Sequence, residues 1–294
     1  MVTVFTPTYN RLYKIDKLYQ SLKRQSCNDF EWIVVDDGSN DGTKEYFEKV
    51  IDNGDPFKIR YFNKENGGKH RAINLGVSQA KGNLFFIVDS DDYLIDNAIE
   101  MILEWEAGLD KSHKWGGVAG SRGYSKDKVI GNRNLRFEYV DAKATERDKY
   151  NLTGDKAEVF FTDVLRKYPF PEIEGEKFIT EDSVWLAIAR DGYYIRWYPN
   201  IIYIGEYLSD GLTKNSNSIF AQNPEGVLYW AKLVLEVYRH NGKKKFSAIS
   251  RYYYAVRDNK TKKEIALDLD ISLFTLNCAI LTVYVGRKIR SILK

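Results

Sequence analysis

Residues 85–92 restrict the fold of this chain more than any other segment. Four consecutive hydrophobic residues, 85–88, are followed at once by Asp89, Asp91 and Asp92. A short apolar run of this kind is typical of a strand buried on both faces, as in a parallel sheet. Ligands of open α/β sheets bind beyond the carboxyl ends of the strands. The sequence therefore predicts three carboxylates at a ligand-binding edge, although a polar turn with Asp92 as a helix cap would give the same pattern.

The chemistry of this acidic cluster points to a cation. Carboxylates that lie close together repel one another unless a cation joins them. An all-oxygen set suits a hard divalent ion, Mg²⁺ or Mn²⁺, that is shared with a substrate phosphate. The acids alone therefore favour a phosphate-containing substrate.

The first hundred residues alternate between strand and helix patterns. Apolar runs predict strands over residues 2–6, 32–35, 59–62 and 84–88, with Pro7 ending the first. Helical periodicity predicts helices over residues 15–25, 43–50 and 72–80. This alternation indicates βαβ units with helices on both faces of the sheet. The predicted fold class is α/β, with a Rossmann-like, mostly parallel sheet flanked by helices and a C-terminal helical appendage.

The pattern is looser after residue 100. Residues 125–155 are polar and charged and predict a long surface loop or lid. A helix is expected over residues 181–190, and one or two strands around Pro199. Composition changes near residue 216, where we place a boundary. The predicted domains are residues 1–215, which we divide into residues 1–100 and 101–215, and a helical region over residues 216–294.

Charge and cysteine content limit the partners and the compartment. The net charge of +3 is too small to favour nucleic acid as a main partner. Two distant cysteines indicate a reducing compartment without a disulfide framework. A strand that begins at Val2 leaves no room for a signal peptide, and no run of 18 apolar residues predicts a membrane span. We expect a cytoplasmic protein, at the inner face of the membrane if its basic region binds lipid.

That basic region covers residues 239–263, with nine Lys or Arg against one Asp. A solvated helical face is the simplest interpretation. Attraction to anionic lipid is the second, because the last eight residues mix cations with apolar side chains. Binding of nucleic acid is the third.

Two further segments belong to the same edge of the predicted sheet. The second strand ends in Asp36 and Asp37, and the first is followed by Thr8, Tyr9 and Asn10. Between the second and fourth strands lies the segment of residues 66–76, in which the pair Gly67 and Gly68 precedes a helix. Glycines at this place let the backbone approach an anionic ligand closely. The segment lacks the Gly-Lys-Ser/Thr ending of a Walker loop, and no Gly-x-Gly-x-x-Gly follows the first strand.

The order of these motifs resembles the inverting GT-A glycosyltransferases of family 2, which build bacterial capsules and related polysaccharides. The resemblance lies in Pro-Thr-Tyr-Asn after strand one, Val-Val-Asp-Asp-Gly-Ser after strand two, Asn-x-Gly before a helix and Asp-x-Asp-Asp after strand four. It covers roughly residues 2–215, and it implies a nucleotide-binding half (1–100) and an acceptor half (101–215). It implies a GT-A fold and a metal-dependent, hexosyltransferase-type enzyme that uses a nucleotide-diphosphate sugar, UDP-linked in our prediction, and a glycan or lipid-linked hydroxyl acceptor.

The resemblance also implies roles for individual residues. Tyr9 would stack on the nucleotide base, and Asp37 would accept from a base N–H. Asp91 would ligate Mn²⁺ or Mg²⁺, and Asp89 would face the ribose or the metal. The residues implied in nucleotide-sugar binding are Pro7, Tyr9, Asp37, Gly67, Lys69, Asp89 and Ser90, and for Lys69 a solvated surface position is an equal alternative.

A general base is expected in the second half, because a sugar hydroxyl must lose its proton as it attacks. The pair Glu181 and Asp182 resembles the Glu-Asp pair of the family, so Asp182 is the predicted base and Glu181 its support. The alternative is that both acids simply occupy the first turn of a helix capped by Thr180. Glu176 is a second candidate for the base.

Two other functions remain open on the sequence. A sugar nucleotidyltransferase shares the fold type and the metal, but it usually carries a Gly-rich basic signature after strand one, where this chain has Pro7 to Arg11. A non-catalytic nucleotide-sugar-binding module would recruit partners through its basic helices. The intact set of acids favours the enzyme.

Overall fold

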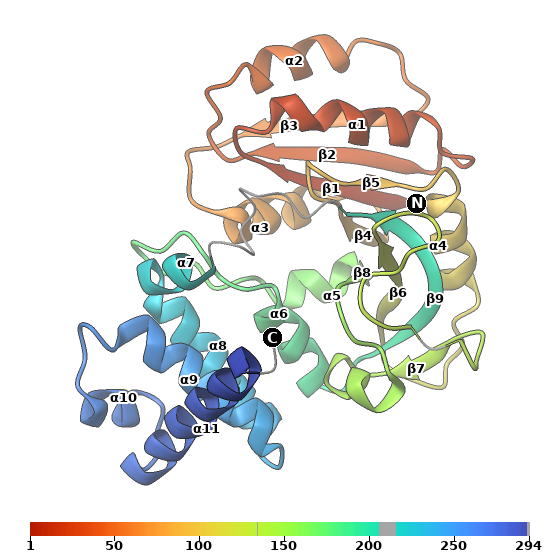
Figure 1. The fold of residues 1–294 in the computed structure, drawn as a ribbon. Coiled ribbons are helices and arrows are strands. Elements are labelled where there is room, and N and C mark those ends of the chain that lie inside the picture. The colour runs from red at the N-terminus through yellow and green to blue at the C-terminus, as the bar shows by residue number, and fades with distance from the viewer. Residues whose placement is uncertain (134, 206–215, 293–294) are drawn as a thin grey trace. The chain divides into compact units, whose positions relative to one another are not determined.

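The computed structural model describes residues 1–133, 135–205 and 216–292, and its chain divides into two compact units (Figure 1). Unit 1 consists of Met1–Phe170 and Ile188–Tyr207, and unit 2 of Pro171–Ala187 and Leu208–Lys294. The predicted boundary near residue 216 was placed by composition. Compactness instead groups residues 171–187, which include Asp182, with the C-terminal helices.

The described part of unit 1 contains one nine-stranded sheet with the order β3-β2-β1-β4-β8-β6-β9-β5, and β7 pairs with β9. The strands are β1 (Val2–Thr8), β2 (Phe30–Asp36), β3 (Lys58–Asn63), β4 (Leu84–Ile87), β5 (Tyr93–Leu94), β6 (Trp115–Gly123), β7 (Val140–Ala142), β8 (Lys156–Phe161) and β9 (Tyr194–Ile204). The α/β fold with flanking helices is as predicted, and the first four strands are parallel. The sheet is mixed beyond β4, because β8 is antiparallel to both β4 and β6.

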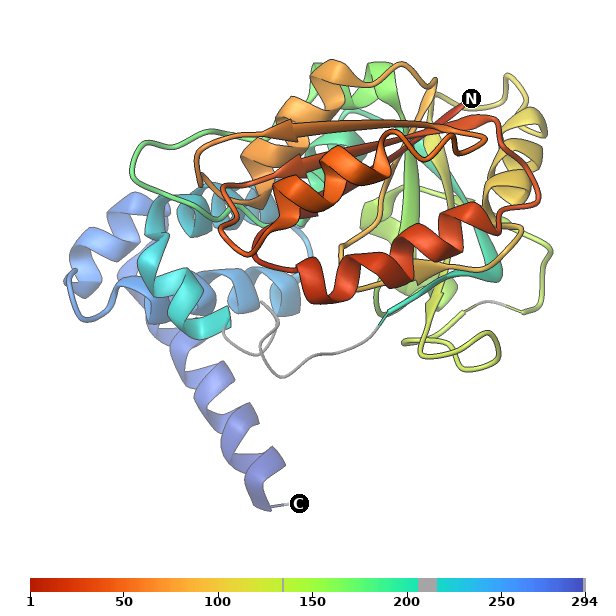
Figure 2. The ribbon, with the colours of Figure 1, turned by 90° about the horizontal axis from the view of Figure 1, so that it is seen from above.

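Helices cover both faces of this sheet. The helices of unit 1 are α1 (Leu12–Lys23), α2 (Thr43–Val50), α3 (Lys69–Gln79), α4 (Ala98–Ala107) and α5 (Thr162–Lys167), with a 3₁₀ helix η1 (Ala144–Tyr150). Figure 2 looks down on the face that α1 and α2 cover. On the opposite face, α3 lies so close to β1 that a Cβ at Gly76 would come within 2.2 Å of the Phe5 ring. Only glycine allows this approach.

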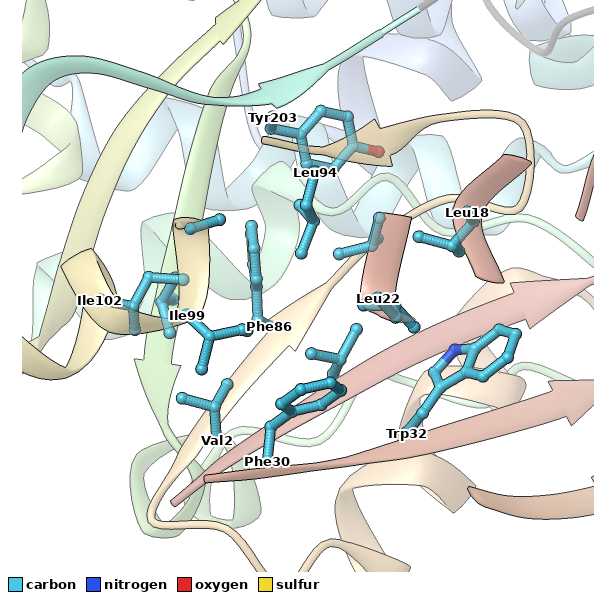
Figure 3. Close-up of a cluster of buried hydrophobic side chains, with 14 of the residues drawn as sticks. Val2, Leu18, Leu22, Phe30, Trp32, Phe86, Leu94, Ile99, Ile102 and Tyr203 are labelled. Carbon is cyan, nitrogen blue, oxygen red and sulfur yellow. The ribbon is translucent and has the colours of Figure 1, made fainter. Parts of the chain in front are cut away.

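The main core lies under α1, α2 and α4. Figure 3 shows the part of it to which Leu18 and Leu22 of α1 and Ile99 and Ile102 of α4 contribute. Side chains that point to one face of β1, β2 and β4 meet the apolar faces of these helices, as the period of two in strands requires. Trp32 is fully buried, and its indole N–H donates to Thr6 Oγ1 at 3.0 Å. Burial of side chains this large stabilises the fold by roughly 1.5–3 kcal/mol each. The core thus holds the parallel strands that carry the acidic motifs.

We predicted that Pro7 ends the first strand, and this was wrong. Strand β1 continues to Thr8, and Pro7 lies opposite Val35. In a parallel ladder, alternate residues face alternate neighbours. Phe5 accepts from Val88 on the β4 side, so Pro7 also faces that side, where β4 pairs with β1 only as far as Phe5. The missing N–H of Pro7 is therefore not needed by the ladder.

The prediction of one long loop over residues 125–155 was wrong in part, since this segment contains β7 and η1. β7 pairs with β9, and the Asp141 carboxylate accepts two hydrogen bonds from the buried Arg196 guanidinium, at 2.7 and 2.8 Å. Polar composition suggested a solvated loop because the sequence does not show which charges are paired. The strands β5 and β8 and the helix α5 were not predicted either.

Lys156 gives this part of the fold a measurable pH dependence. Its buried amine donates to the carbonyls of Asn132 and Thr153, both at 2.7 Å. Burial, with a smaller effect from Arg147, lowers the pKa of Lys156 from 10.5 to about 8. At pH values between these two pKa values, Lys156 binds more protons in the unfolded chain than in the folded chain. The contribution of Lys156 to stability therefore rises with pH.

We expect the unfolding free energy of the wild type to rise by about 2 kcal/mol relative to Lys156→Met from pH 7 to pH 9.5. Urea denaturation of both proteins at each pH measures this difference. Subtracting the variant removes the effect of the other titrating groups. A difference that stays constant over this range would contradict the prediction.

The helices of unit 2 are the first part of α6 (Asp182–Arg190), α7 (Ser216–Gln222), α8 (Pro224–Val237), α9 (Gly242–Val256), α10 (Lys262–Asp268) and α11 (Leu273–Ile292). Helix α9 contacts α7, α8, α10 and α11 and is the centre of this unit. Both carboxylate oxygens of Glu176 accept from the backbone N–H groups of Glu225 and Gly226, each at 2.6 Å. Glu176 therefore caps α8, which is a structural role for the second candidate base.

Among the described residues, no single helix is long and apolar enough to cross a bilayer. Helices α10 and α11 together, as Lys262–Asp268 and Leu273–Val283 with a bend of 103°, meet the length and composition of a span.

Candidate functional site

The carboxyl ends of β1, β2 and β4 lie at one edge of the sheet in unit 1. This follows from their parallel pairing, with Thr8 opposite Asp36 and Phe5 opposite Ile87. The segments that begin with Tyr9, Asp37 and Val88 all leave the sheet at this edge. The structure therefore brings together the three motifs that the sequence analysis singled out.

Asp37 organises the glycine loop, which we define as residues 64–68, at this edge of the sheet. Its oxygen Oδ1 accepts from Lys64 Nζ at 2.6 Å and from Gly67 N–H at 2.9 Å. Its oxygen Oδ2 accepts from Gly68 N–H at 2.7 Å and from Asn66 Nδ2 at 3.2 Å. These four donors match the acceptor capacity of a carboxylate. Asp37 thus holds the loop before α3. The contact with a base N–H that the resemblance implies stays a prediction, since one of these four donors would have to give way.

We expect Asp37→Asn to weaken UDP binding by at least about tenfold and to lower stability by about 1–3 kcal/mol. An amide offers one acceptor oxygen and turns its NH₂ toward two N–H donors. Calorimetry with UDP and urea denaturation measure the two effects. Asp52→Asn, at an exposed position after α2, is the control and should change neither. Unchanged UDP affinity in Asp37→Asn would contradict the role of the loop.

The loops after β1 and β2 are bonded to each other. Asn10 has a left-handed φ of 51°, its N–H donates to Ser39 Oγ at 2.8 Å, and its side-chain oxygen accepts from Asn40 N–H at 2.9 Å. Tyr9, just before, is 50% exposed, so its ring is open to a ligand. Pro7 is partly buried in β1. Asp36 is fully buried and accepts from Ser39 N–H and the Tyr61 hydroxyl, so it is structural.

Asp89 begins the aspartate turn, residues 89–92, and is flanked by two cations. Lys69 Nζ lies 2.6 Å from Asp89 Oδ1, and an Arg122 guanidinium nitrogen lies 3.8 Å from Asp89 Oδ2. Burial would raise the pKa of Asp89, but Lys69 and Arg122 outweigh it and hold the pKa below its ordinary value. Asp89 is therefore ionised at neutral pH. Lys69 contacts the turn instead of pointing to solvent.

The other residues of the aspartate turn have different surroundings from those of Asp89. Asp92 is buried and accepts from the Tyr203 hydroxyl at 2.6 Å, so it anchors the turn to β9. Ser90 is also buried. Asp91 is half-buried, and burial together with the charge of Asp89 raises the pKa of its carboxylate.

The raised pKa of Asp91 shows how a cation would fit this turn. Two carboxylates repel each other here, and a divalent ion would relieve that repulsion. No group of three or more His, Cys, Asp or Glu side chains among the described residues is arranged to hold a metal by itself. Mg²⁺ and Mn²⁺ are commonly bound by one or two carboxylates and the phosphates of a substrate. The donor set around Asp91 fits an ion that is held jointly with a diphosphate.

Glu181 and Asp182 belong to unit 2, at the start of α6. Asp182 is exposed, and its charge acts on Arg251 of α9. The Arg251 guanidinium lies over the Trp230 ring at 4.0 Å and the Phe220 ring at 5.0 Å. The carbonyl groups of Thr180 and Glu181 accept from Ser183 and Val184, which is ordinary for a first helical turn. Asp182 therefore occupies the first turn of α6, while Glu181 precedes this helix, and the position of Asp182 is compatible with a base.

Sequence reasoning missed Lys64, Arg122 and Tyr203. Arg122 and Tyr203 lie 33 and 114 residues from Asp89, outside any motif, and no signal in the sequence connects them to the turn. Residues 207–214, which resemble a segment of the family that lies near the diphosphate, are outside the described residues.

The chain belongs to glycosyl transferase family 2, whose model matches residues 3–167. It is a glycosyltransferase, and the inverting type we predicted is consistent with this family. The two alternatives, a nucleotidyltransferase and a non-catalytic module, do not agree with this membership. The matched range contains the glycine loop and the aspartate turn.

Relatives in sequence carry related names. The chain is 25% identical over 260 residues to a GalNAc(5)-diNAcBac-PP-undecaprenol beta-1,3-glucosyltransferase of Campylobacter jejuni, covering 86% of this chain and 80% of that protein. It is 36% identical over 104 residues to a chondroitin synthase of Pasteurella multocida, covering 35% of this chain and 11% of that protein.

Two solved structures share the fold. TarS 1-349 of S. aureus in complex with UDP-GlcNAc has a TM-score of 0.61 and 17% identity, covering 97% of this chain and 92% of that one. The mannosyltransferase PcManGT of Pyrobaculum calidifontis, in complex with GDP-Man and Mn²⁺, has a TM-score of 0.56 and 19% identity, covering 95% and 86%.

Proposed function

We propose that this protein transfers a sugar from a UDP-linked donor to a hydroxyl of a glycan or lipid-linked acceptor, with inversion, in the synthesis of a cell-surface polysaccharide such as a capsule. The observation that carries the proposal is the edge of unit 1, where the loop held by Asp37 and the aspartate turn lie at the carboxyl ends of β2 and β4, the two strands that pair with β1 in parallel. The names of the relatives support the donor and the acceptor, since one acts on an undecaprenol-linked glycan and one fold neighbour binds UDP-GlcNAc.

On the donor side, each predicted residue has a specific task. The exposed Tyr9 ring stacks on the base beside Pro7, and the Asp37 loop with Gly67 shapes the base pocket. Lys69 lies at the N-terminus of α3, where cation and helix dipole both favour a phosphate. Asp89 and Ser90 lie at the turn and contact the ribose.

Asp91, with Asp89 beside it, would hold Mn²⁺ or Mg²⁺ together with the diphosphate. When bound, the ion neutralises the charge that builds up on the leaving diphosphate. Lys69 and Arg122 keep Asp89 ionised, but their positive charges already balance its charge, so Asp91 would be the main ligand of the ion. A fold neighbour contains Mn²⁺, which supports the choice of metal.

Asp182 takes the proton of the acceptor hydroxyl as its oxygen attacks the anomeric carbon from the side opposite the diphosphate. Attack from that side inverts the configuration. Glu181 supports Asp182 through its local hydrogen bonds. Asp182 is exposed in unit 2, as a group that meets an incoming acceptor must be. In this proposal, residues 1–100 bind the nucleotide, residues 101–215 the acceptor, and residues 216–294 form an appendage.

Transfer assays test this function. Full-length protein is incubated with Mn²⁺, with a panel of UDP- and GDP-sugars and with glycan and lipid-linked acceptors, and products are separated by mass spectrometry. We expect UDP release that depends on both acceptor and metal. Pyrophosphate release from a nucleoside triphosphate, or UDP binding without turnover on the whole panel, would contradict the proposal.

We also propose that unit 2 contacts the anionic inner face of the membrane, in the cytoplasm. Residues 239–294 carry thirteen Lys and Arg against four Asp and Glu, a far larger excess than the +3 of the whole chain. Leu267 in α10 and Phe274 in α11 are 80% and 77% exposed. Cations with exposed apolar side chains are typical of surfaces that bind an anionic bilayer.

Vesicle sedimentation measures this contact. Wild-type protein should bind vesicles that contain phosphatidylglycerol and should not bind pure phosphatidylcholine vesicles. Phe274→Glu should weaken binding at least about fivefold, because it replaces an inserted ring by a charge. Phe137→Glu, which alters a 61% exposed ring of unit 1, is the matched control and should bind like the wild type. Equal binding by all three proteins would contradict the proposal.

A further inference from the structure

The hydroxyl of Tyr203 joins both ends of the aspartate turn. Tyr203, on β9, is fully buried. Its hydroxyl accepts from Asp89 N–H at 3.0 Å and donates to Asp92 Oδ2 at 2.6 Å. The turn adds one bond of its own, from Asp92 N–H to the Asp89 carbonyl at 3.1 Å. One side chain from a distant strand therefore closes a turn that regular pairing does not hold, since β4 ends at Ile87.

Arg122, on β6, fixes Tyr203 and the turn from another side. Its guanidinium lies over the Tyr203 ring at 4.1 Å, and its Nε donates to the Lys156 carbonyl at 2.9 Å. The same guanidinium places a nitrogen 3.8 Å from Asp89 Oδ2. Arg122 thus has little freedom, and it presents its charge to Asp89 in one orientation.

The chemistry of the hydroxyl suits a fixed support. A tyrosine hydroxyl both donates and accepts, so Tyr203 can hold Asp92 and the Asp89 N–H at the same time. Breaking either hydrogen bond of this buried hydroxyl would leave a polar group without a partner, which is costly. The hydroxyl therefore resists movement of the turn.

We propose that Tyr203 and Arg122 are positioning residues of the transfer reaction, which hold the aspartate turn so that Asp91 meets the metal and the diphosphate. The proposal rests on the metal role given to Asp91 under the proposed function. Neither residue belongs to the motifs of the sequence. Partners behind a metal ligand commonly change metal affinity or activity by roughly 10- to 100-fold when removed.

Tyr203→Phe tests the hydroxyl alone. We expect the affinity for Mn²⁺ in the presence of UDP, measured by calorimetry, to fall by roughly 10- to 100-fold. UDP affinity in EDTA should stay the same, because the base contacts are untouched. In metal-free protein, the Asp89 amide should exchange its hydrogen faster, because its acceptor is gone. The value of kcat should fall while the KM of the acceptor changes little.

Tyr252→Phe is the matched control. Tyr252, in α9 of unit 2, is also fully buried, and its hydroxyl also bonds one carboxylate, that of Asp268, and one nitrogen, Lys260 Nζ at 3.2 Å. The melting temperature should fall in both variants. Only Tyr203→Phe should lose affinity for Mn²⁺ and protection of the Asp89 amide.

Arg122 variants provide a second route if Tyr203→Phe does not fold. Arg122 is 17% exposed, and Arg122→Met should fold and lose Mn²⁺ affinity, with Arg122→Lys restoring part of it. Wild-type Mn²⁺ affinity in either Tyr203→Phe or Arg122→Met would overturn the proposal. If the wild type itself binds no Mn²⁺ with UDP, the metal role of Asp91 fails, and the exchange of the Asp89 amide still decides whether Tyr203 holds the turn.

Discussion

Asp182→Asn is expected to lower kcat by about 10²–10⁴-fold, because an amide cannot take the proton of the attacking hydroxyl. UDP and Mn²⁺ affinities should remain near those of the wild type, since the donor-side residues belong to unit 1. The change should cost no more than about 1 kcal/mol of stability, the usual contribution of a charge in the first turn of a helix. Steady-state kinetics, calorimetry with UDP and urea denaturation measure the three quantities.

The control for Asp182 is Asp163→Asn. Asp163 also lies in the first turn of a helix, α5, and it is exposed and ion-paired with Arg166 at 2.8 Å. Loss of that charge should affect stability in the same small way and leave kcat unchanged. A folded Asp182→Asn protein with full transfer activity would exclude Asp182 as the base. Glu181→Gln should reduce activity less than Asp182→Asn, in agreement with a supporting role.

Asp91→Asn has the second largest expected effect, a loss of transfer of at least about 100-fold. The amide removes the negative charge of Asp91, which favours a cation at the turn, so Mn²⁺ binding in the presence of UDP should weaken in parallel. EDTA should abolish transfer by the wild type, and added Mn²⁺ should restore it. Activity measured against Mn²⁺ concentration separates lost affinity from lost turnover.

Asp96→Asn is the control for Asp91. Asp96 follows five residues later, is exposed and pairs with Arg24 at 3.2 Å and Lys126 at 3.8 Å. Its neutralisation should not change the dependence of activity on Mn²⁺. An Asp91→Asn enzyme that needs the same Mn²⁺ concentration as the wild type and turns over at the same rate would remove Asp91 from the metal site.

Much of the first half could be predicted because its signals are local. The runs around Trp32 and Phe86 are apolar throughout, so a strand buried on both faces was the natural interpretation. The apolar positions of α1 and α2 recur at helical spacing. Parallel pairing then brings the motif after each strand to one edge, so the site followed from the alternation of elements.

The second half of the chain could be predicted less well, because its strands are held by contacts with residues that are far away in the sequence. In β8, Lys156 and Glu158 alternate with Ala157 and Val159, but the charged face is not solvated, since Lys156 is buried and bonds two carbonyls. The ion pair of Asp141 with Arg196 helps the segment of residues 140–142, which lies in a hydrophilic stretch, to join the sheet as β7. Neither pairing leaves a trace in the local composition.

The amino-acid sequence determined which residues can perform chemistry at the end of each strand, since strand length and the placement of Asp37, Asp89 and Asp91 are local properties. Tertiary structure alone decided what surrounds these acids. Lys69 comes from α3, Arg122 and the Tyr203 hydroxyl come from strands far along the chain, and the pKa of Asp89 depends on all three. Burial and charge pairing act through space, so they arise only once the chain has folded.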